Sequence, residues 1–222
     1  MHIAVSDEIS LLVVKFGIGG NLRFLSHAET LRVFQRACVR AGIKIQYSQG
    51  FNPHPKLSLP LPRSVGVEAD DDLLCIRVDK STSELCDSIK TNLSQQLPEG
   101  FELLSVTVPE GKTSFQPCSA TYVLEVKREY LDDKLKSRII HLLANETLNI
   151  QRGINAGESK IKNVDVRGFL KSIVLKDRCI IVECKISSAG SIRVEEILNL
   201  LELDVERLAA PIRRTSVQWQ ET

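Results

Sequence analysis

The sequence predicts an α+β protein made of two ferredoxin-like halves, each a split βαβ arrangement with an antiparallel sheet, the second with an extra hairpin. The chain has 222 residues, enough for two domains of about 100 residues each. Short apolar segments typical of strands alternate with segments of helical spacing in the order β-α-β-β-α-β. This order returns after a loop at residues 109–117. We therefore expect one domain at residues 1–110, with a basic helix and a proline-rich loop, and a second at residues 111–222.

The first helix is the best-marked element of the first half. Ser26 and Glu29 have the spacing of a capping box, and Gly42 is well placed to end the helix. The next helix is expected over residues 81–96, with Ser81 or Ser83 as its cap. Because proline cannot donate to a ladder, residues 56–62 form an edge strand at best, and residues 43–47 are either a short strand or the entry to a loop. Strands are expected at residues 10–16, 73–78 (after an acidic turn at 70–72) and 101–108.

The second half repeats the pattern with weaker signals. A hairpin is expected where two apolar runs flank the turn residues Lys176 and Asp177. The other expected elements are a strand at 120–127, helices at 132–144 and 194–201, a strand at 148–151, a Gly/Asn loop at 153–159 and a last strand at 212–219.

Composition argues against several classes of protein. The longest apolar runs fall far short of the roughly 20 residues that span a bilayer, and the N-terminus lacks the basic region of a secretory signal, so we expect a cytoplasmic protein without membrane contact. The six cysteines form no CxxC or CxxxCxxC motif, and the four histidines are scattered, so no metal or other cofactor is expected. A dinucleotide-binding GxGxxG motif fails because Leu22 stands where its last glycine is needed.

Positive charge is concentrated in one segment. Residues 11–67 contain eight Lys or Arg but a single acid, Glu29, although the whole chain carries only +1. Arg32, Arg36 and Arg40 are four residues apart, so they should stack along one exposed side of the helix and repel one another. This pattern favours an anionic partner. The alternative is a solvated face, or pairing with acids of the other half.

The proline-rich loop follows this helix and contains half of the chain's prolines between Pro53 and Pro62. Its amide, aromatic and cationic side chains are those that contact single-stranded RNA, where aromatic rings stack on bases. We predict that RNA or a protein partner is bound by Arg23, Arg32, Arg36, Arg40, Tyr47, Gln49, Phe51, Asn52, His54, Lys56 and Arg63.

Two histidines are candidates for catalysis. His27 lies in the first helical turn, where an anion is favoured, and His54 lies in the loop near Tyr47 and Lys56. Such groups could support metal-free cleavage of RNA, with one deprotonating the 2′-hydroxyl and another protonating the leaving oxygen. Binding without catalysis, or a purely structural loop, explains the same residues. A further polar cluster in the second half comprises Asp165, Arg167, Arg213 and Arg214, for which an internal Asp–Arg pair is the simpler explanation.

The stretches RFLSH at residues 23–27 and YSQGFNPHPKLS at residues 47–58 resemble the radical-SAM-linked protein family. Residues 97–100, 164–167 and 212–215 extend the resemblance over nearly the whole chain, although the family more usually has a proline where Gly168 stands here. That family is a bacterial domain of unknown function found beside, or fused to, B12-binding-type radical-SAM proteins. The resemblance implies a radical-SAM protein as partner, and it implies no activity or catalytic residue.

Three hypotheses follow from the sequence. The first is an accessory module that binds tRNA or rRNA for a radical-SAM RNA-modification protein. The second is a protein-interaction module that docks on a radical-SAM enzyme without touching RNA. The third, less favoured, is a metal-independent ribonuclease. Under the first two hypotheses the chain is a non-catalytic partner rather than an enzyme.

Overall fold

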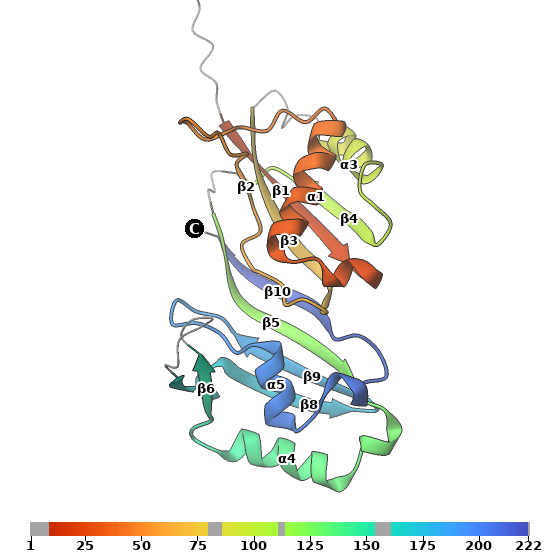
Figure 1. Ribbon diagram of the computed structural model, residues 1–222, viewed down its shortest axis with the longest axis vertical. Helices are drawn as coiled ribbons and strands as arrows, with labels where there is room; N and C mark the ends of the chain where they lie inside the picture. Colours follow the sequence, from red (N-terminus) through yellow and green to blue (C-terminus); the bar gives the residue numbers. More distant parts are fainter. Residues whose placement is uncertain (1–8, 80–85, 111–113, 154–160, 222) are drawn as a thin grey trace, which may run out of the picture. The chain divides into compact units, whose positions relative to one another are not determined.

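The computed structural model describes residues 9–79, 86–110, 114–153 and 161–221 (Figure 1). The chain divides into two compact units: unit 1 comprises residues 1–116 and 220–222, and unit 2 comprises residues 117–219. Each unit contains both helices and strands, so the predicted α+β class is confirmed. The two units are described separately below.

Unit 1 has the predicted element order β-α-β-β-α-β. Neighbouring strands pair antiparallel in the order β4-β1-β3, and β2 pairs with β3. A short 3₁₀ helix, η1, precedes the first α-helix. The elements are β1 (Ile9–Ile18), η1 (Gly20–Phe24), α1 (His27–Arg40), β2 (Leu57–Ser58), β3 (Glu68–Asp79), α3 (Cys86–Ser94) and β4 (Phe101–Thr107).

The core of unit 1 lies between one face of this sheet and the two helices. Alternate residues of β1 and β3 point toward α1 and α3, as the two-residue period of a strand requires. Phe16 and Phe34 pack edge to face with ring centroids 4.7 Å apart, and Phe101 lies 5.2 Å from Phe34. The buried residues of this core include Leu12, Val14, Ala37, Cys38, Leu74, Ile76, Val78, Ile89 and Leu93.

The acidic run at residues 70–72 is not a turn, so that expectation was wrong. These residues lie inside β3, where Asp72 is buried opposite Phe16. Lys15 lies diagonally across the strands from Asp71, and its Nζ is 3.1 Å from the Asp71 Oδ2 atom. A cross-strand cation therefore lets an acidic residue continue the strand. Ser81 and Ser83, the expected caps of the second helix, lie outside the described residues.

Unit 2 has a sheet with the strand order β10-β5-β9-β8, and a separate two-stranded ladder of β6 and β7. Helices α4 and α5 bury Leu135, Ile139, Leu142, Ile197 and Leu201. The elements are β5 (Phe115–Glu125), η2 (Arg128–Tyr130), α4 (Asp133–Ala144), β6 (Asn149–Gly153), β7 (Ile161–Asp165), η3 (Arg167–Phe169), β8 (Leu170–Lys176), β9 (Cys179–Lys185), α5 (Val194–Leu201), η4 (Val205–Arg207) and β10 (Arg213–Glu221).

Several expectations for unit 2 are confirmed and two are not. The helix at residues 194–201 has the predicted bounds, and α4 begins one residue after the predicted start at residue 132, because Asp132 caps the helix. The hairpin of β8 and β9 is present, but it turns one residue later than expected, with Asp177 at φ +54°. Strand β7 was missed, although it pairs with β6 along its whole length. Among the described helices, none is long and apolar enough to cross a membrane.

Candidate nucleic-acid interface

The arginine stripe, defined as Arg32, Arg36 and Arg40, lies on the outer side of α1. All three side chains are exposed, whereas the opposite side of the helix buries Phe34 and Cys38 in the core of unit 1. The stripe therefore lies on the surface, as the four-residue spacing predicts. Arg40 is also tied to the region after α3, since its Nε and Nη2 atoms donate to the side-chain and backbone oxygens of Gln96 at 3.2 and 2.6 Å.

The start of α1 is fixed by the predicted capping box. The Glu29 amide donates to the Ser26 hydroxyl at 3.3 Å, and the Ser26 amide donates to the Glu29 carboxylate at 2.8 Å. The hydrogen bonds from the Ser26 hydroxyl and amide lower the pKa of Glu29, with a smaller contribution from the charge of Arg32. The single acid of the basic segment is therefore already engaged in capping the N-terminus of α1.

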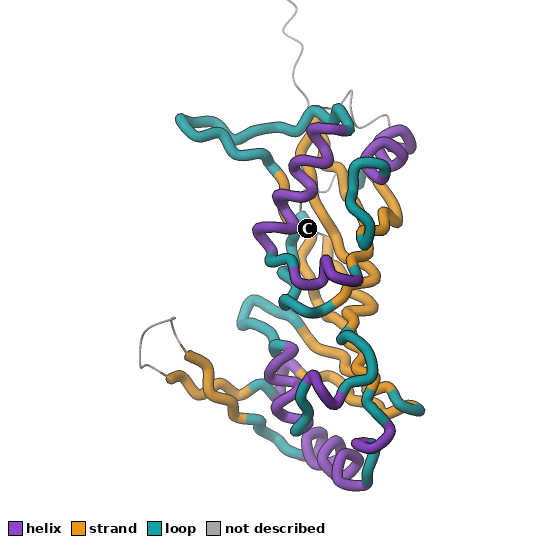
Figure 2. The backbone as a smooth tube through the Cα atoms, turned by 45° about the vertical axis from the view of Figure 1, so that its right-hand side comes forward, coloured by secondary structure: helices purple, strands orange, loops and turns teal. Residues whose placement is uncertain are grey.

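Residues 46–56, called the protrusion here, form a narrow two-armed loop that stands away from the strands of unit 1 (Figure 2). Its root is anchored on β3, because the Gln46 amide donates to the Arg77 carbonyl at 2.8 Å. The arms are joined where the Lys56 amide donates to the Gln46 carbonyl at 2.7 Å. Nearer the tip, the Ser48 amide donates to the His54 carbonyl at 2.8 Å, and the His54 amide donates to the Ser48 hydroxyl at 2.9 Å.

The tip of the protrusion presents side chains to solvent. Phe51 has a relative exposure of 106%, so its ring is held outside the core altogether. Tyr47 is 42% exposed on one arm of the loop. The other exposed residues of the protrusion include Gln49, Asn52, His54 and Lys56, and none of its residues is acidic.

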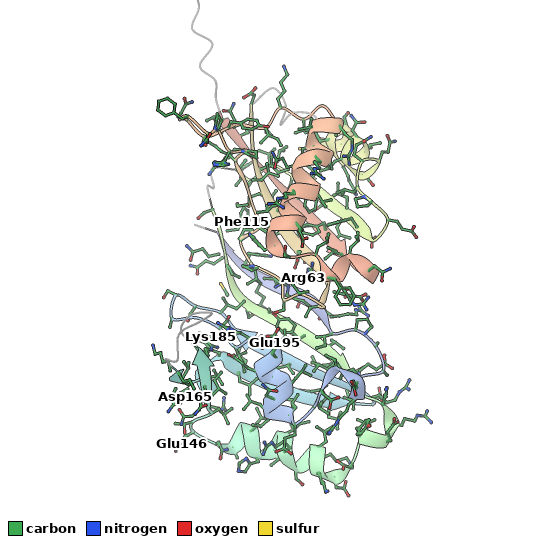
Figure 3. The ribbon with its side chains drawn as sticks, viewed as in Figure 1. Arg63, Phe115, Glu146, Asp165, Lys185 and Glu195 are labelled. Carbon is green, nitrogen blue, oxygen red and sulfur yellow. The ribbon has the colours of Figure 1, made fainter. Side chains whose placement is uncertain are left out.

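Arg63 and Arg23 make internal bonds that shape this surface. Arg63 donates from Nη1 to the carbonyls of Arg23, at 2.7 Å, and Val67, and from Nη2 to the carbonyl of Leu25 at 3.1 Å (Figure 3). Arg23 donates to the carbonyl of Gly20 at 2.7 Å, and its guanidinium lies 4.3 Å from the centroid of the Phe24 ring. Arg63 therefore ties the end of the proline-rich loop to η1 and the chain after it.

The two histidines are not brought together as an acid–base pair. His27 is the first residue of α1, whereas His54 belongs to the protrusion, which follows the other end of that helix (Figure 2). The His27 Nδ1 atom is buried and has no hydrogen-bond partner among the described residues. His27 and His54 therefore do not form a pair in which one residue removes a proton and the other donates one on the two sides of a single phosphate.

Within the polar cluster of the second half, Asp165 and Arg167 bond to the backbone of unit 2. Asp165 accepts from the amides of Leu148 and Arg167, at 2.8 and 2.9 Å, and these bonds lower the pKa of its carboxyl (Figure 3). The Arg167 guanidinium donates to the carbonyls of Leu143 and Asn145 at the end of α4. Arg214 is 1% exposed and Arg213 is exposed, so neighbouring residues of β10 point to opposite faces.

Two structural features were missed by the sequence reasoning, an ion pair in unit 2 and a hollow in unit 1. Arg152 on β6 and Glu196 on α5 form a two-pronged ion pair, with distances of 2.7 and 2.8 Å and little solvent exposure. Arg77 and Phe115 line a hollow with Lys56 in unit 1. Arg77 could have been noticed in the sequence, because it is the one charged residue in the otherwise apolar run of residues 73–78. The pairing of Arg152 with Glu196 could not, because the two residues are far apart in the sequence.

The cysteines behave as core residues where they are buried. Burial raises the pKa of Cys38 and of Cys184 to about 12, and that of Cys75 to about 11. These thiols are therefore protonated at neutral pH and are poor nucleophiles. Within the described ranges, no group of three or more His, Cys, Asp and Glu side chains is placed to hold a metal ion.

Comparison with known proteins gives a family for this chain. A family model described as "Uncharacterized protein conserved in bacteria (DUF2344)" matches residues 12–198. The chain belongs to this family. The family's description names no activity and no radical-SAM partner. A search of curated proteins returned no match.

Two solved structures are similar to the chain at low identity. One is a chain of the "Crystal Structure of a Cbf5-Nop10-Gar1 Complex", with 10% identity and a TM-score of 0.45, matching 93% of this chain and 48% of that one. The present chain thus spans about half the length of that protein. The other is the acetolactate synthase small subunit from Thermotoga maritima, with 10% identity, a TM-score of 0.27, and coverage of 97% and 98%.

Proposed function

We propose that this protein is a non-catalytic module that binds tRNA or rRNA and works with a radical-SAM RNA-modification protein. The main support for RNA binding is that the arginine stripe and the protrusion lie in one stretch of chain, residues 30–67, which contains no acidic residue. Phosphate backbones are bound mainly by such cations, and unpaired bases by exposed aromatic rings. The radical-SAM partner is proposed from the resemblance in sequence alone.

The residues of the interface have different roles in this proposal. Arg32 and Arg36 contact phosphates, and Arg40 does so while it remains bonded to Gln96. Tyr47 and Phe51 stack on unpaired bases, because their rings are exposed and are held by the hydrogen-bonded arms of the protrusion. The remaining contacts are hydrogen bonds and phosphate contacts from Gln49, Asn52, His54 and Lys56.

Arg23 and Arg63 contribute indirectly. Their guanidinium groups bond to backbone carbonyls of unit 1, so we propose that they position the interface rather than hold RNA. The same assignment applies to the polar cluster of unit 2, whose Asp165 and Arg167 bond to the backbone of that unit.

A protein-interaction module that docks on a radical-SAM enzyme is the second candidate. The fully exposed ring of Phe51 favours it, because aromatic residues are enriched in the centres of protein interfaces. The metal-independent ribonuclease is the weakest candidate, since His27 and His54 lie in separate parts of unit 1.

We further propose that both units are ferredoxin-like halves, that the domain boundary lies near residue 110, and that the protein acts in the cytoplasm.

Photochemical crosslinking to RNA, read by mass spectrometry, tests this function. The protein is irradiated with total tRNA and with rRNA fragments, and the crosslinked peptides are identified. We expect crosslinks within residues 32–40 and 47–56 of unit 1. Crosslinks confined to unit 2, or none with either RNA, would reject RNA binding at this surface. Co-purification with the radical-SAM protein in that case would favour the second candidate.

A further inference from the structure

A hollow of about 410 Å³ opens at the root of the protrusion in unit 1. It lies on the face of the sheet that the helices do not cover, because Cys75 and Arg77 alternate along β3 with the residues that face α1 and α3. Its volume is within the range of about 300–1,000 Å³ that small-molecule sites occupy. The lining residues are Leu11, Lys56, Leu57, Ser58, Pro60, Cys75, Arg77, Ser114 and Phe115.

Two cations, Lys56 and Arg77, line this hollow side by side. The Arg77 amide donates to the Lys56 carbonyl at 3.0 Å. Leu57 of β2 pairs with Ile76 of β3, so the residues next to them, Lys56 and Arg77, are cross-strand neighbours. Like charges placed directly opposite on a sheet are destabilising. Among the described residues that line the hollow, none is acidic. Two cationic side chains in one lining make the hollow attractive to an anionic group.

The rest of the lining suits a flat and largely apolar group with a few polar atoms. Leu11 and Cys75 are buried members of the lining. Phe115, which is labelled in Figure 3, lines the hollow from the start of β5 and is half-buried. The hydroxyls of Ser58 and Ser114 supply hydrogen-bonding groups at the wall. Burial raises the pKa of Cys75 to about 11, so this thiol is a neutral part of the lining.

We infer that this hollow binds a nucleoside monophosphate unit, with its phosphate between Lys56 and Arg77 and its base against Phe115. Aromatic side chains stack on every base because each base has a π-face, and a lysine beside an arginine is a strong phosphate site. The unit is either a free nucleotide or one nucleotide of an RNA chain. If the unit belongs to an RNA chain, the inference rests on the proposed function. Binding of a free nucleotide does not, because none of the arginines of the stripe lines the hollow.

Calorimetric titration of the full chain with AMP, GMP, CMP, UMP and inorganic phosphate tests the inference. We expect at least one nucleotide to bind saturably and more tightly than phosphate. Lys56→Gln and Phe115→Ala should each weaken that binding about tenfold, because they remove the phosphate contact and the stacking surface. Lys44→Gln is the matched control, since this exposed lysine precedes the protrusion and does not line the hollow.

Three outcomes would overturn the inference. They are no saturable binding of any of the four nucleotides, phosphate binding as tightly as the best nucleotide, and equal affinities in wild type and in both hollow variants. Because Phe115→Ala could unsettle β5, circular dichroism checks that each variant is folded, and Lys56→Gln gives an independent result from an exposed side chain.

A 5′-phosphorylated tetranucleotide distinguishes the two sources of the nucleotide. If the unit belongs to RNA, the tetranucleotide should bind at least tenfold more tightly than the mononucleotide, and the Arg32/Arg36/Arg40→Ala variant should lose that gain while it keeps mononucleotide binding. If free nucleotides are the ligands, the tetranucleotide gains nothing, and mononucleotide binding is unaffected in the stripe variant. Mononucleotide binding therefore tests the hollow, and the additional affinity of the tetranucleotide tests RNA binding at the arginine stripe, so the two claims can fail independently.

Discussion

Ser48 and His54 close the protrusion with two hydrogen bonds: the Ser48 amide donates to the His54 carbonyl at 2.8 Å, and the His54 amide donates to the Ser48 hydroxyl at 2.9 Å. Only the second bond needs the serine side chain. A loop that is held in this way presents Phe51 with less conformational freedom to lose on binding, which favours affinity.

Ser48→Ala should loosen the tip of the protrusion while the rest of unit 1 stays folded. We expect the His54 amide to exchange with solvent faster, and global stability to fall by no more than about 1 kcal/mol, the usual net value of one hydrogen bond. Hydrogen exchange followed by NMR measures the first effect and urea unfolding the second. Unchanged exchange at His54 would show that the serine hydroxyl does not hold the tip.

Arg63→Ala should destabilise unit 1 by about 2 kcal/mol, because it leaves several carbonyls without the charged donor that they share. Arg63→Lys should not restore this stability, since an ammonium cannot reproduce the fork of the guanidinium. Urea unfolding measures both variants. Arg32→Ala, an exposed arginine of the stripe, is the control and should change stability by less than about 0.5 kcal/mol. Similar losses for Arg63→Ala and Arg32→Ala would contradict the positioning role of Arg63.

Glu196→Gln should destabilise unit 2 strongly, because Arg152 would keep its charge at a site with side-chain exposures of only 19% and 11% for the two partners. Breaking a buried ion pair by removing one partner costs about 3 kcal/mol. Asp133→Asn is the control: it removes the exposed pair of Asp133 with Lys136, which contributes little. Denaturant unfolding compares the two variants, and a loss for Glu196→Gln as small as that of the control would disprove a structural role for the pair.

The capping box should make the stability of unit 1 depend on acid pH. The folded pKa of Glu29 is lowered from 4.5, so its contribution is complete above about pH 5 and is lost as the pH falls through the lowered value. Thermal unfolding between about pH 6 and about pH 3 should show a smaller decline for Glu29→Gln than for wild type. Equal declines would mean that Glu29 titrates alike in the folded and unfolded chain.

Elements with strong local signals were predictable from the sequence. The capping box of Ser26 and Glu29, the hairpin around Asp177 and the helix at residues 194–201 were found because a few neighbouring residues determine each of them. The exposure of the arginine stripe was predictable for the same reason, since helical spacing alone sets which residues share a side.

Features that depend on register or on distant partners were not predictable. Asp71 looks like a turn residue until Lys15 is placed across the sheet from it, and β7 becomes a strand because β6 pairs with it. The neighbouring positions of Lys56 and Arg77 likewise follow from the pairing of β2 with β3. Proline was correctly taken to limit β2, but no sequence pattern could reveal the hollow beside it.

The central claim is that RNA binds to the arginine stripe, and fluorescence anisotropy on fractionated tRNA across a salt series tests it most directly. Wild type is compared with Arg32/Arg36/Arg40→Ala and with Lys134/Lys162/Lys185→Ala, which removes the same charge from exposed lysines of unit 2. Each lost phosphate contact on a single strand lowers the salt slope by about 0.7, so the stripe variant should lose about two units and the control almost none. Equal slopes and affinities for wild type and the stripe variant would contradict the claim.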